Sequence, residues 1–99
     1  MNLGVGGRAH PPQARVLEAL ANESRLKIVD RLSRGECSVG ELPGVVGTDR
    51  TTVSKHRAVL RAHGIVNDRR HGNAVYSTLL TPCVMSFFSC ATQALEHRV

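Results

Sequence analysis

The chain has 99 residues and carries 13 Lys and Arg against 8 Asp and Glu, which gives a formal net charge of +5. This length predicts one domain with a thin hydrophobic core, to which a dimer contact would add buried surface. The sequence has no apolar run near ~18 residues, so we expect no membrane span. It has only three aromatic side chains, which argues against a stacking platform for single-stranded nucleic acid.

The number of cysteines, three, is odd and bears on the compartment. A secreted disulfide scaffold needs paired cysteines, so free thiols in a reducing cytosol fit better. The N-terminus also lacks the apolar segment of a secretory signal peptide. We therefore expect a cytoplasmic protein.

Gly and Pro are frequent in residues 1–12, which predicts a disordered arm ahead of a folded domain over 13–99. Helical spacing begins near residue 13, where the apolar stripe is Val16, Leu17 and Leu20. Asn22 is the predicted N-cap of a second helix over 23–33, which ends before Gly35. The residues expected to face inward from this helix are Leu26, Val29 and Leu32.

A third, short helix is predicted over 39–46. Ser38 and Glu41 have the spacing of a capping box, in which each side chain bonds the backbone amide of the other residue. Pro43 lies inside this helix, so we expect an irregular start.

Asp49 is the predicted N-cap of a fourth helix, over 50–63. The period of the apolar residues then changes from 3.6 to 2, which predicts strands over 65–70 and 74–80. A turn over 71–73 that contains Gly joins them into a hairpin.

Pro82 is the predicted first residue of a final helix that runs to about residue 97. Its apolar stripe is Val84, Phe87, Phe88, Ala91 and Leu95. A helix–turn–helix followed directly by a basic hairpin is a winged helix–turn–helix. The predicted fold is therefore mainly α with a small β-hairpin, in the order α-α-α-α-β-β-α, and we expect a homodimer through the first and last helices.

The positive charge is concentrated in residues 49–71, which hold six Lys and Arg against two Asp. This window therefore carries +4 of the net +5, together with three of the histidines. A cluster of basic residues on one segment is typical of a protein that binds the phosphate backbone of nucleic acid.

Over residues 16–80 the chain contains ordered sequence blocks, which read ALANESRL at 19–26, SVGEL at 38–42, TVSKH at 52–56, GIV at 64–66 and DRR at 68–70. In these blocks the chain resembles the ArsR/SmtB family of winged-helix repressors. The resemblance implies a homodimer that binds double-stranded operator DNA and releases it when a metal or metalloid binds. Similar proteins usually have Leu where this chain has Arg57, and an Arg there is expected to snorkel or face DNA.

A recognition helix contacts base edges with its N-terminal residues. The predicted DNA contacts on the fourth helix are Arg50, Thr51, Thr52, Ser54, Lys55 and His56. Those on the hairpin, which would contact the backbone or the minor groove, are Arg69, Arg70 and His71.

The predicted metal ligands are Cys37, Cys83 and Cys90. Three thiolates and no nearby carboxylate suit As(III) or Sb(III), and with a fourth ligand Cd(II), Pb(II) or Zn(II). On a regular helix Cys83 and Cys90 are ~10.5 Å apart, which is too far for one ion, so either the helix breaks near Cys83 or the site is shared across the dimer. The cysteine pair and the acid–histidine pairs that similar metal sensors use are absent or incomplete here.

The leading hypothesis is a repressor that holds DNA without a cofactor and is released by a thiophilic ion. The same fold could instead sense thiol oxidation or a persulfide, through Cys83 and Cys90 or Cys37. A third possibility is a constitutive DNA-binding module with inert cysteines. An enzyme is not expected, because the sequence has no phosphate-binding loop and no nucleophile with a paired base.

Overall fold

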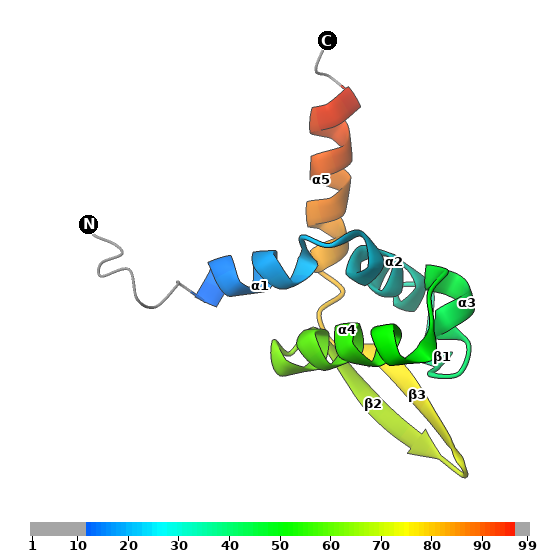
Figure 1. Ribbon diagram of the computed structural model, residues 1–99. Helices are drawn as coiled ribbons and strands as arrows, with labels where there is room; N and C mark the ends of the chain where they lie inside the picture. Colours follow the sequence, from blue (N-terminus) through cyan, green and yellow to red (C-terminus); the bar gives the residue numbers. More distant parts are fainter. Residues whose placement is uncertain (1–11, 97–99) are drawn as a thin grey trace.

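The computed structural model describes residues 12–96 (Figure 1). The described elements, in chain order, are α1 (Pro12–Leu20), α2 (Glu23–Leu32), β1 (Cys37–Ser38), α3 (Leu42–Val46), α4 (Arg50–Ala62), β2 (Val66–His71), β3 (Ala74–Leu79) and α5 (Val84–Glu96). This order confirms the predicted winged helix–turn–helix. The predicted arm lies outside the described residues except for Pro12, which begins α1.

The predicted caps of the two longer internal helices form as expected. The Asn22 side chain accepts a hydrogen bond from the Arg25 amide at the start of α2, and Asp49 accepts one from the Thr52 amide at the start of α4. Each bond satisfies an amide that has no partner inside its own helix. The Thr52 bonds also lower the pKa of Asp49.

The predicted third helix is wrong at its start, because α3 begins at Leu42. The chain before it is extended: Cys37 and Ser38 pair with β3, and the Val39 amide donates to the Val75 carbonyl at 2.9 Å. Residues in a ladder cannot also cap a helix, so the predicted capping box is absent. Pro43 lies in the first turn of the shorter helix, where its missing N–H costs nothing.

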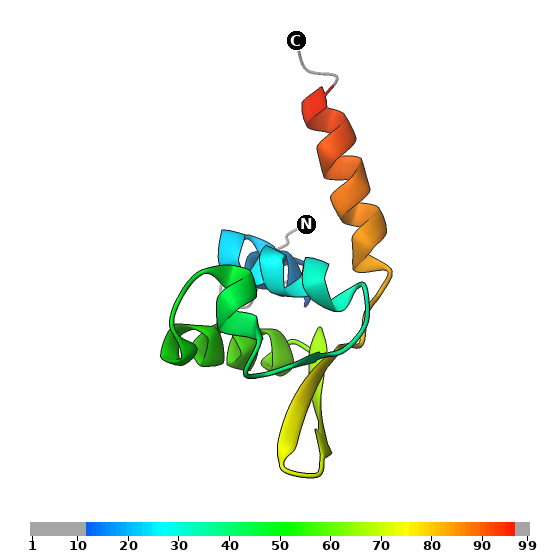
Figure 2. The same cartoon turned by 90° about the vertical axis from the view of Figure 1, so that its right-hand side faces the viewer.

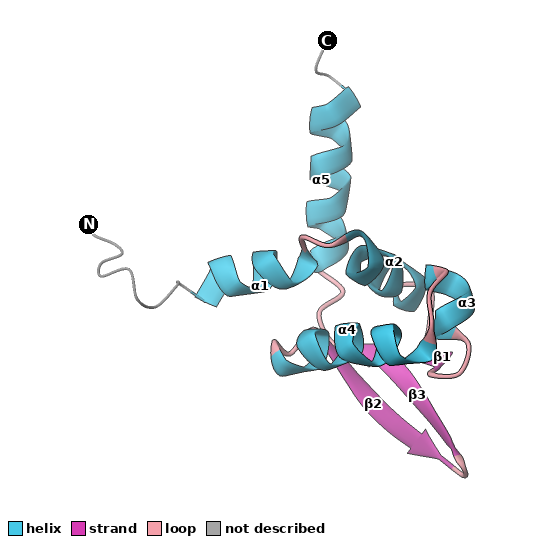
Figure 3. Cartoon of the chain, viewed as in Figure 1, coloured by secondary structure: helices cyan, strands magenta, loops and turns pink. Residues whose placement is uncertain are grey.

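The three strands form an antiparallel sheet in the order β1-β3-β2 (Figure 3). The hairpin was predicted with a three-residue turn, but His71 pairs with Ala74, which leaves the two-residue turn Gly72-Asn73. Gly72 has a φ of 65°, a value that favours glycine. The hairpin therefore extends one residue further toward its tip and forms the wing beside α4.

The core lies between α1, α2, α3, α4 and the base of the wing. Val29 and Leu32 are buried as predicted, and Val53 and Leu60 of α4 are buried as well. Leu26 is not, since 36% of it is exposed, and Ile28 is the fully buried residue of α2 instead. The complete buried apolar set is Ala19, Leu20, Ile28, Val29, Leu32, Cys37, Leu42, Val46, Val53, Leu60, Ile65 and Val66.

Helix α5 projects from the body on the side opposite the wing in both views (Figures 1 and 2). Pro82 was predicted as its first residue, but α5 begins at Val84 after a tighter turn, in which the Val84 and Met85 amides bond the carbonyls three residues back. Val84, Met85 and Phe88 touch the core, whereas Leu95 is 67% exposed. Within the described residues no helix is long and apolar enough to cross a membrane.

Candidate DNA-binding surface and cysteine positions

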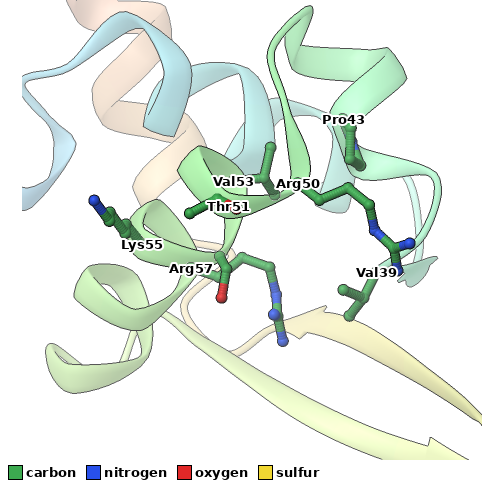
Figure 4. Close-up of a pocket in the computed structure, with 8 residues that line it drawn as sticks. Val39, Pro43, Arg50, Thr51, Val53, Lys55 and Arg57 are labelled. Carbon is green, nitrogen blue, oxygen red and sulfur yellow. The ribbon is translucent and has the colours of Figure 1, made fainter.

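The N-terminal half of α4 forms one side of a surface hollow, and the segment from β1 to α3 forms the other (Figure 4). Arg50, Thr51, Ser54 and Lys55 are exposed there. In Figure 4 Arg50 lies beside Val39, and the Arg57 side chain points toward the wing. The hollow is lined by Val39, Pro43, Arg50, Thr51, Val53, Ser54, Lys55 and Arg57.

The free positive charge of this surface comes from three residues. Arg50, Lys55 and Arg70 have no ion-pair partner among residues 12–96, whereas Arg57, Arg61 and Arg69 each pair with an acid. Only the first three are therefore available to phosphates without breaking an existing pair. The structure thus separates the six basic residues of the 49–71 window into two equal groups.

The predicted contact His56 is turned toward α2 and is half-buried. Its Nδ1 lies 3.3 Å from Nη1 of Arg25, whose guanidinium also donates to the Ala19 carbonyl at the end of α1. Burial, together with the Arg25 charge, lowers the pKa of His56. His56 therefore belongs to the junction of α1, α2 and α4, while Thr52, also half-buried, remains at the edge of the exposed set.

Arg57 was expected to snorkel or to face DNA, and this expectation is wrong. Only 7% of Arg57 is exposed, and its guanidinium is enclosed between α4 and the wing. Nε donates to Ser77 Oγ at 3.0 Å, and Nη2 donates to Asp68 Oδ1. A charge can be buried at this position because the two strands supply an ion-pair partner and a hydroxyl.

Asp68 is the centre of this polar cluster. Its Oδ1 also accepts from Ser77 Oγ at 3.3 Å, and its Oδ2 accepts from Arg61 Nη1 at 2.7 Å. Burial acts to raise the pKa of Asp68, but the hydrogen bond and charge of Arg57 and the charge of Arg61 outweigh it, so the pKa is lowered. Asp68 is therefore an ionised carboxylate whose two oxygens both accept hydrogen bonds within this cluster.

The opposite face of the wing holds two of the other predicted contacts, Arg69 and His71. Arg69 bonds Glu36, with Nε donating to Oε2 at 3.1 Å, and its guanidinium lies 5.9 Å from the Tyr76 ring centroid. His71 packs edge-on against the same ring, at 6.5 Å between centroids. The Arg69 hydrogen bond lowers the pKa of Glu36. Arg69 is thus held by the protein, whereas Arg70 is not.

Cys37 lies in β1 and is 2% exposed. Its thiol donates to Glu41 Oε1 at 3.4 Å and lies 3.5 Å from the Ser38 carbonyl oxygen. Burial raises the pKa of Cys37, and the hydrogen bond to Glu41 raises it further. A thiol that is buried and holds its proton is a poor ligand and a poor nucleophile.

The other two cysteines are exposed free thiols. Cys83 precedes α5, so the helix does not extend through it, and Cys90 lies in the middle of α5. Cys90 comes two residues after Phe88, which places it about 200° around the helix from that side chain. Within residues 12–96 of one chain, no three His, Cys, Asp or Glu residues are grouped so that they could hold a metal.

An apolar surface runs across α1, α2 and α5. Leu26, Phe88 and Ala91 line two adjoining grooves, one toward Leu17 of α1 and one toward Leu95. Glu23, Lys27 and Asp30 form a charged rim along the second groove. The Phe87 side chain, also predicted on this stripe, lies outside the described residues, as do residues 97–99.

Sequence reasoning missed Arg25, Glu36 and Ser77. Arg25 joins α1 to the recognition helix, Glu36 neutralises a wing arginine, and Ser77 is completely buried against Arg57. The sequence did contain a signal for the Arg57–Asp68 pair. Arg57 stands where similar proteins have an inward-facing Leu, and a buried charge requires a partner of opposite sign. Asp68, eleven residues later in the basic window, is that partner.

Comparison with known families and proteins gives consistent results. A family model described as a helix–turn–helix domain matches residues 20–69. The transcriptional activator HlyU of Vibrio cholerae is 42% identical over 64 residues, which cover 65% of this chain and 59% of HlyU. The biofilm growth-associated repressor of Xylella fastidiosa is 39% identical over 66 residues, 67% of this chain and 58% of that protein. The chain therefore spans about three fifths of the length of these relatives.

Solved structures agree with the sequence matches. The homodimeric winged helix–turn–helix DNA-binding domain of Mb0332 from Mycobacterium bovis, described as a possible ArsR-family transcriptional regulator, superposes with a TM-score of 0.78 at 32% identity. The match covers 88% of this chain and 84% of that domain. The reduced form of V. cholerae HlyU superposes with a TM-score of 0.73 at 32% identity over 89% of this chain and 90% of that one.

Proposed function

This chain belongs to the ArsR family of winged helix–turn–helix transcription regulators, and we propose that it binds double-stranded operator DNA as a homodimer and represses transcription there. Its family consists of regulators and not of enzymes. One observation carries the proposal: among residues 12–96, Arg50 and Lys55 on the exposed end of α4 and Arg70 of the wing have no ion-pair partner, and exposed hydroxyl groups lie beside the first two on α4.

The recognition helix would enter the major groove with its N-terminal turn. Arg50 has the fork geometry to read guanine, and Thr51 and Ser54 can bond bases or phosphates. Lys55 supplies a phosphate contact further along α4, and Arg70 extends the contacts to the backbone or the minor groove. His56 and Arg69 are bonded within the protein and contribute less.

A homodimer is supported by the unpartnered apolar surface. Leu17 is 45% exposed, Leu26 36% and Leu95 67%, all around the α1, α2 and α5 grooves. Burying this surface in a second copy would stabilise a chain whose own core is thin. Two recognition helices in a symmetric dimer would then meet successive major grooves, roughly 34 Å apart.

The test is selection of duplexes from a randomised pool by the protein, followed by fluorescence anisotropy and transcription in vitro. A palindromic site whose half-sites lie one helical turn apart supports the dimer, and lower transcript yield supports repression. Absence of sequence preference, with binding that disappears at moderate salt, contradicts the proposal.

For the inducing signal we propose a thiophilic ion, As(III) or Sb(III) first and Cd(II), Pb(II) or Zn(II) next, bound through Cys83 and Cys90. These are the exposed thiols, and each loses its proton when it binds a soft ion. The burial of Cys37 favours a site built from Cys83 and Cys90, either within one chain, since α5 begins after Cys83, or across the dimer. Cys83→Ser and Cys90→Ser should then retain DNA affinity and lose release by As(III), while Cys37→Ser should respond more nearly as wild type.

A second candidate signal is oxidation or persulfidation of the same two thiols. It is favoured by their exposure without a third ligand in the described chain. Anisotropy titrations with As(III), with an oxidant and with a persulfide donor separate the two candidates. If every reagent still releases DNA from the Cys83→Ser/Cys90→Ser protein as it does from the wild type, both candidate signals are contradicted.

A further inference from the structure

The geometry points to Arg57 as the residue that positions the wing for DNA: its guanidinium ties the recognition helix α4 to β2 and β3 through Asp68 and Ser77. The inference rests on the proposed DNA binding and adds a positioning role for a side chain that itself lies beneath the surface. It concerns the contact made by Arg70, which is the unpaired arginine of the wing.

The link reaches both strands of the wing at one level. Asp68 and Ser77 are directly opposite each other in the β2–β3 ladder, and a single guanidinium bonds both of them. Arg57 is 7% exposed and Ser77 is 0% exposed, so the bond between them is shielded from water, while the Asp68 side chain keeps 27% of its surface exposed. Within the described residues no buried side-chain nitrogen or oxygen is left without a partner, so the cluster is complete.

The position of Arg70 follows from the same ladder. Side chains alternate along a strand, so Arg70 is on the same face of β2 as Asp68, about 7 Å nearer the tip. The face fixed by Arg57 is therefore the face that carries the free charge, while Arg69 is on the other face with Glu36. A shift of β2 relative to α4 would move Arg70 directly.

An arginine fork fixes this arrangement more tightly than apolar packing would. Planar hydrogen bonds constrain direction as well as distance, whereas two apolar surfaces can slide by a fraction of a residue at little cost. Arg57 is also part of the lining of the hollow at the start of α4. One side chain thus sets the spacing between the two elements proposed to contact the same DNA.

The test is a double-mutant cycle on DNA affinity. Arg57→Leu and Arg70→Ala, singly and together, are measured in the 99-residue chain by anisotropy on a labelled duplex selected by the wild type, across a salt series. We expect Arg70→Ala to weaken binding roughly tenfold in the wild-type background and to lower the salt slope by about 1 per subunit. In the Arg57→Leu background it should change affinity less than twofold.

The matched control is Arg61→Leu, the same substitution on the same helix at the exposed partner of Asp68. It should leave the effect of Arg70→Ala nearly intact. Additive effects of Arg57→Leu and Arg70→Ala, with both proteins folded by circular dichroism, would overturn the inference and assign Arg57 to stability alone. If Arg57→Leu does not fold, Arg57→Lys retains the charge without the fork and is expected to show the same loss of coupling. A wild type that binds no selected duplex contradicts the proposed function instead.

Discussion

The two halves of the molecule satisfy their side chains in opposite ways. In the half formed by α4 and the wing, charged groups lie between helix and sheet and bond one another, as Arg57 does with Asp68 and Ser77. In the half formed by α1 and α5, Leu17 and Leu95 remain exposed along apolar grooves. The first half is complete within one chain, and the second leaves an apolar surface that the proposed dimer would bury.

This difference makes the half formed by α4 and the wing the rigid part of the molecule and the half formed by α1 and α5 the part suited to respond to a ligand. A directional polar cluster holds the proposed DNA-contacting elements in one arrangement, whereas an apolar interface permits small rotations of one protomer against the other. A ligand at Cys83 or Cys90 would act in the second half. It would change the distance between the two recognition helices of the dimer without altering the structure around either helix. A coupling of ~1–3 kcal/mol is typical of such linkage and acts in both directions.

Thiol reactivity should show the largest contrast between the halves. Cys83 and Cys90 should react with a thiol reagent such as Ellman's reagent within seconds, and Cys37 roughly 1000-fold more slowly, since it requires local opening of β1. Raising the pH should not remove the difference, because burial as well as a raised pKa protects Cys37. Three equally fast thiols would show that β1 is not part of the stable core.

One added charge on the apolar surface should disrupt the proposed dimer contact. Ala91→Glu puts a carboxylate between the two grooves of α5, and burial of two unpaired copies should weaken the dimer by roughly 100-fold or more. Gln93→Glu adds the same charge to the same helix about 200° away and is the matched control. Sedimentation equilibrium gives the dissociation constants, and equal values for the two variants would place the interface elsewhere.

The polar cluster should make stability depend on pH. The pKa of Asp68 is lowered in the folded state, so its ionised form stabilises the fold above the unfolded value near ~3.9, and this contribution is lost as pH falls through the folded value. Asp68→Asn should lower the free energy of unfolding by roughly 1–3 kcal/mol at pH 7 and by progressively less below about pH 4. Urea titrations at several pH values check this, and a difference that does not vary with pH would mean that the carboxylate charge is not used.

Local features of the fold could be predicted from the sequence, and contacts between distant segments could not. The N-caps Asn22 and Asp49 bond amides three residues away, so the local sequence was enough to locate the starts of α2 and α4. Glu36 and Arg69 are 33 residues apart, and Arg57 and Ser77 are 20 apart. Since each side chain has many possible distant partners, a basic window could be identified while the three charges already paired within it could not.

Removal of a single unpaired charge from the proposed DNA-binding surface should weaken DNA binding without changing the fold. Lys55→Ala and Arg70→Ala should each lower affinity roughly tenfold near 0.1 M salt and reduce the salt slope by about 1 per subunit. Arg34→Ala is the control, because Arg34 pairs with Asp30 and lines neither the hollow at α4 nor the apolar grooves. If the control loses as much affinity as the other two, the effect reflects net charge and not a located contact.

The smallest effects distinguish the two faces of the wing. Arg69 is bonded to Glu36 and lies against Tyr76, so Arg69→Ala should change DNA affinity less than about threefold, well below the loss expected for Arg70→Ala. Glu36→Gln removes the acid, frees the Arg69 charge for phosphate and should tighten binding by roughly threefold to fivefold, with a steeper salt dependence. The pair is exposed, so neither substitution should lower the melting temperature appreciably. Anisotropy at two salt concentrations measures both variants on one duplex. Equal losses for Arg69→Ala and Arg70→Ala would mean that DNA displaces Glu36 and that both faces of the wing take part in binding.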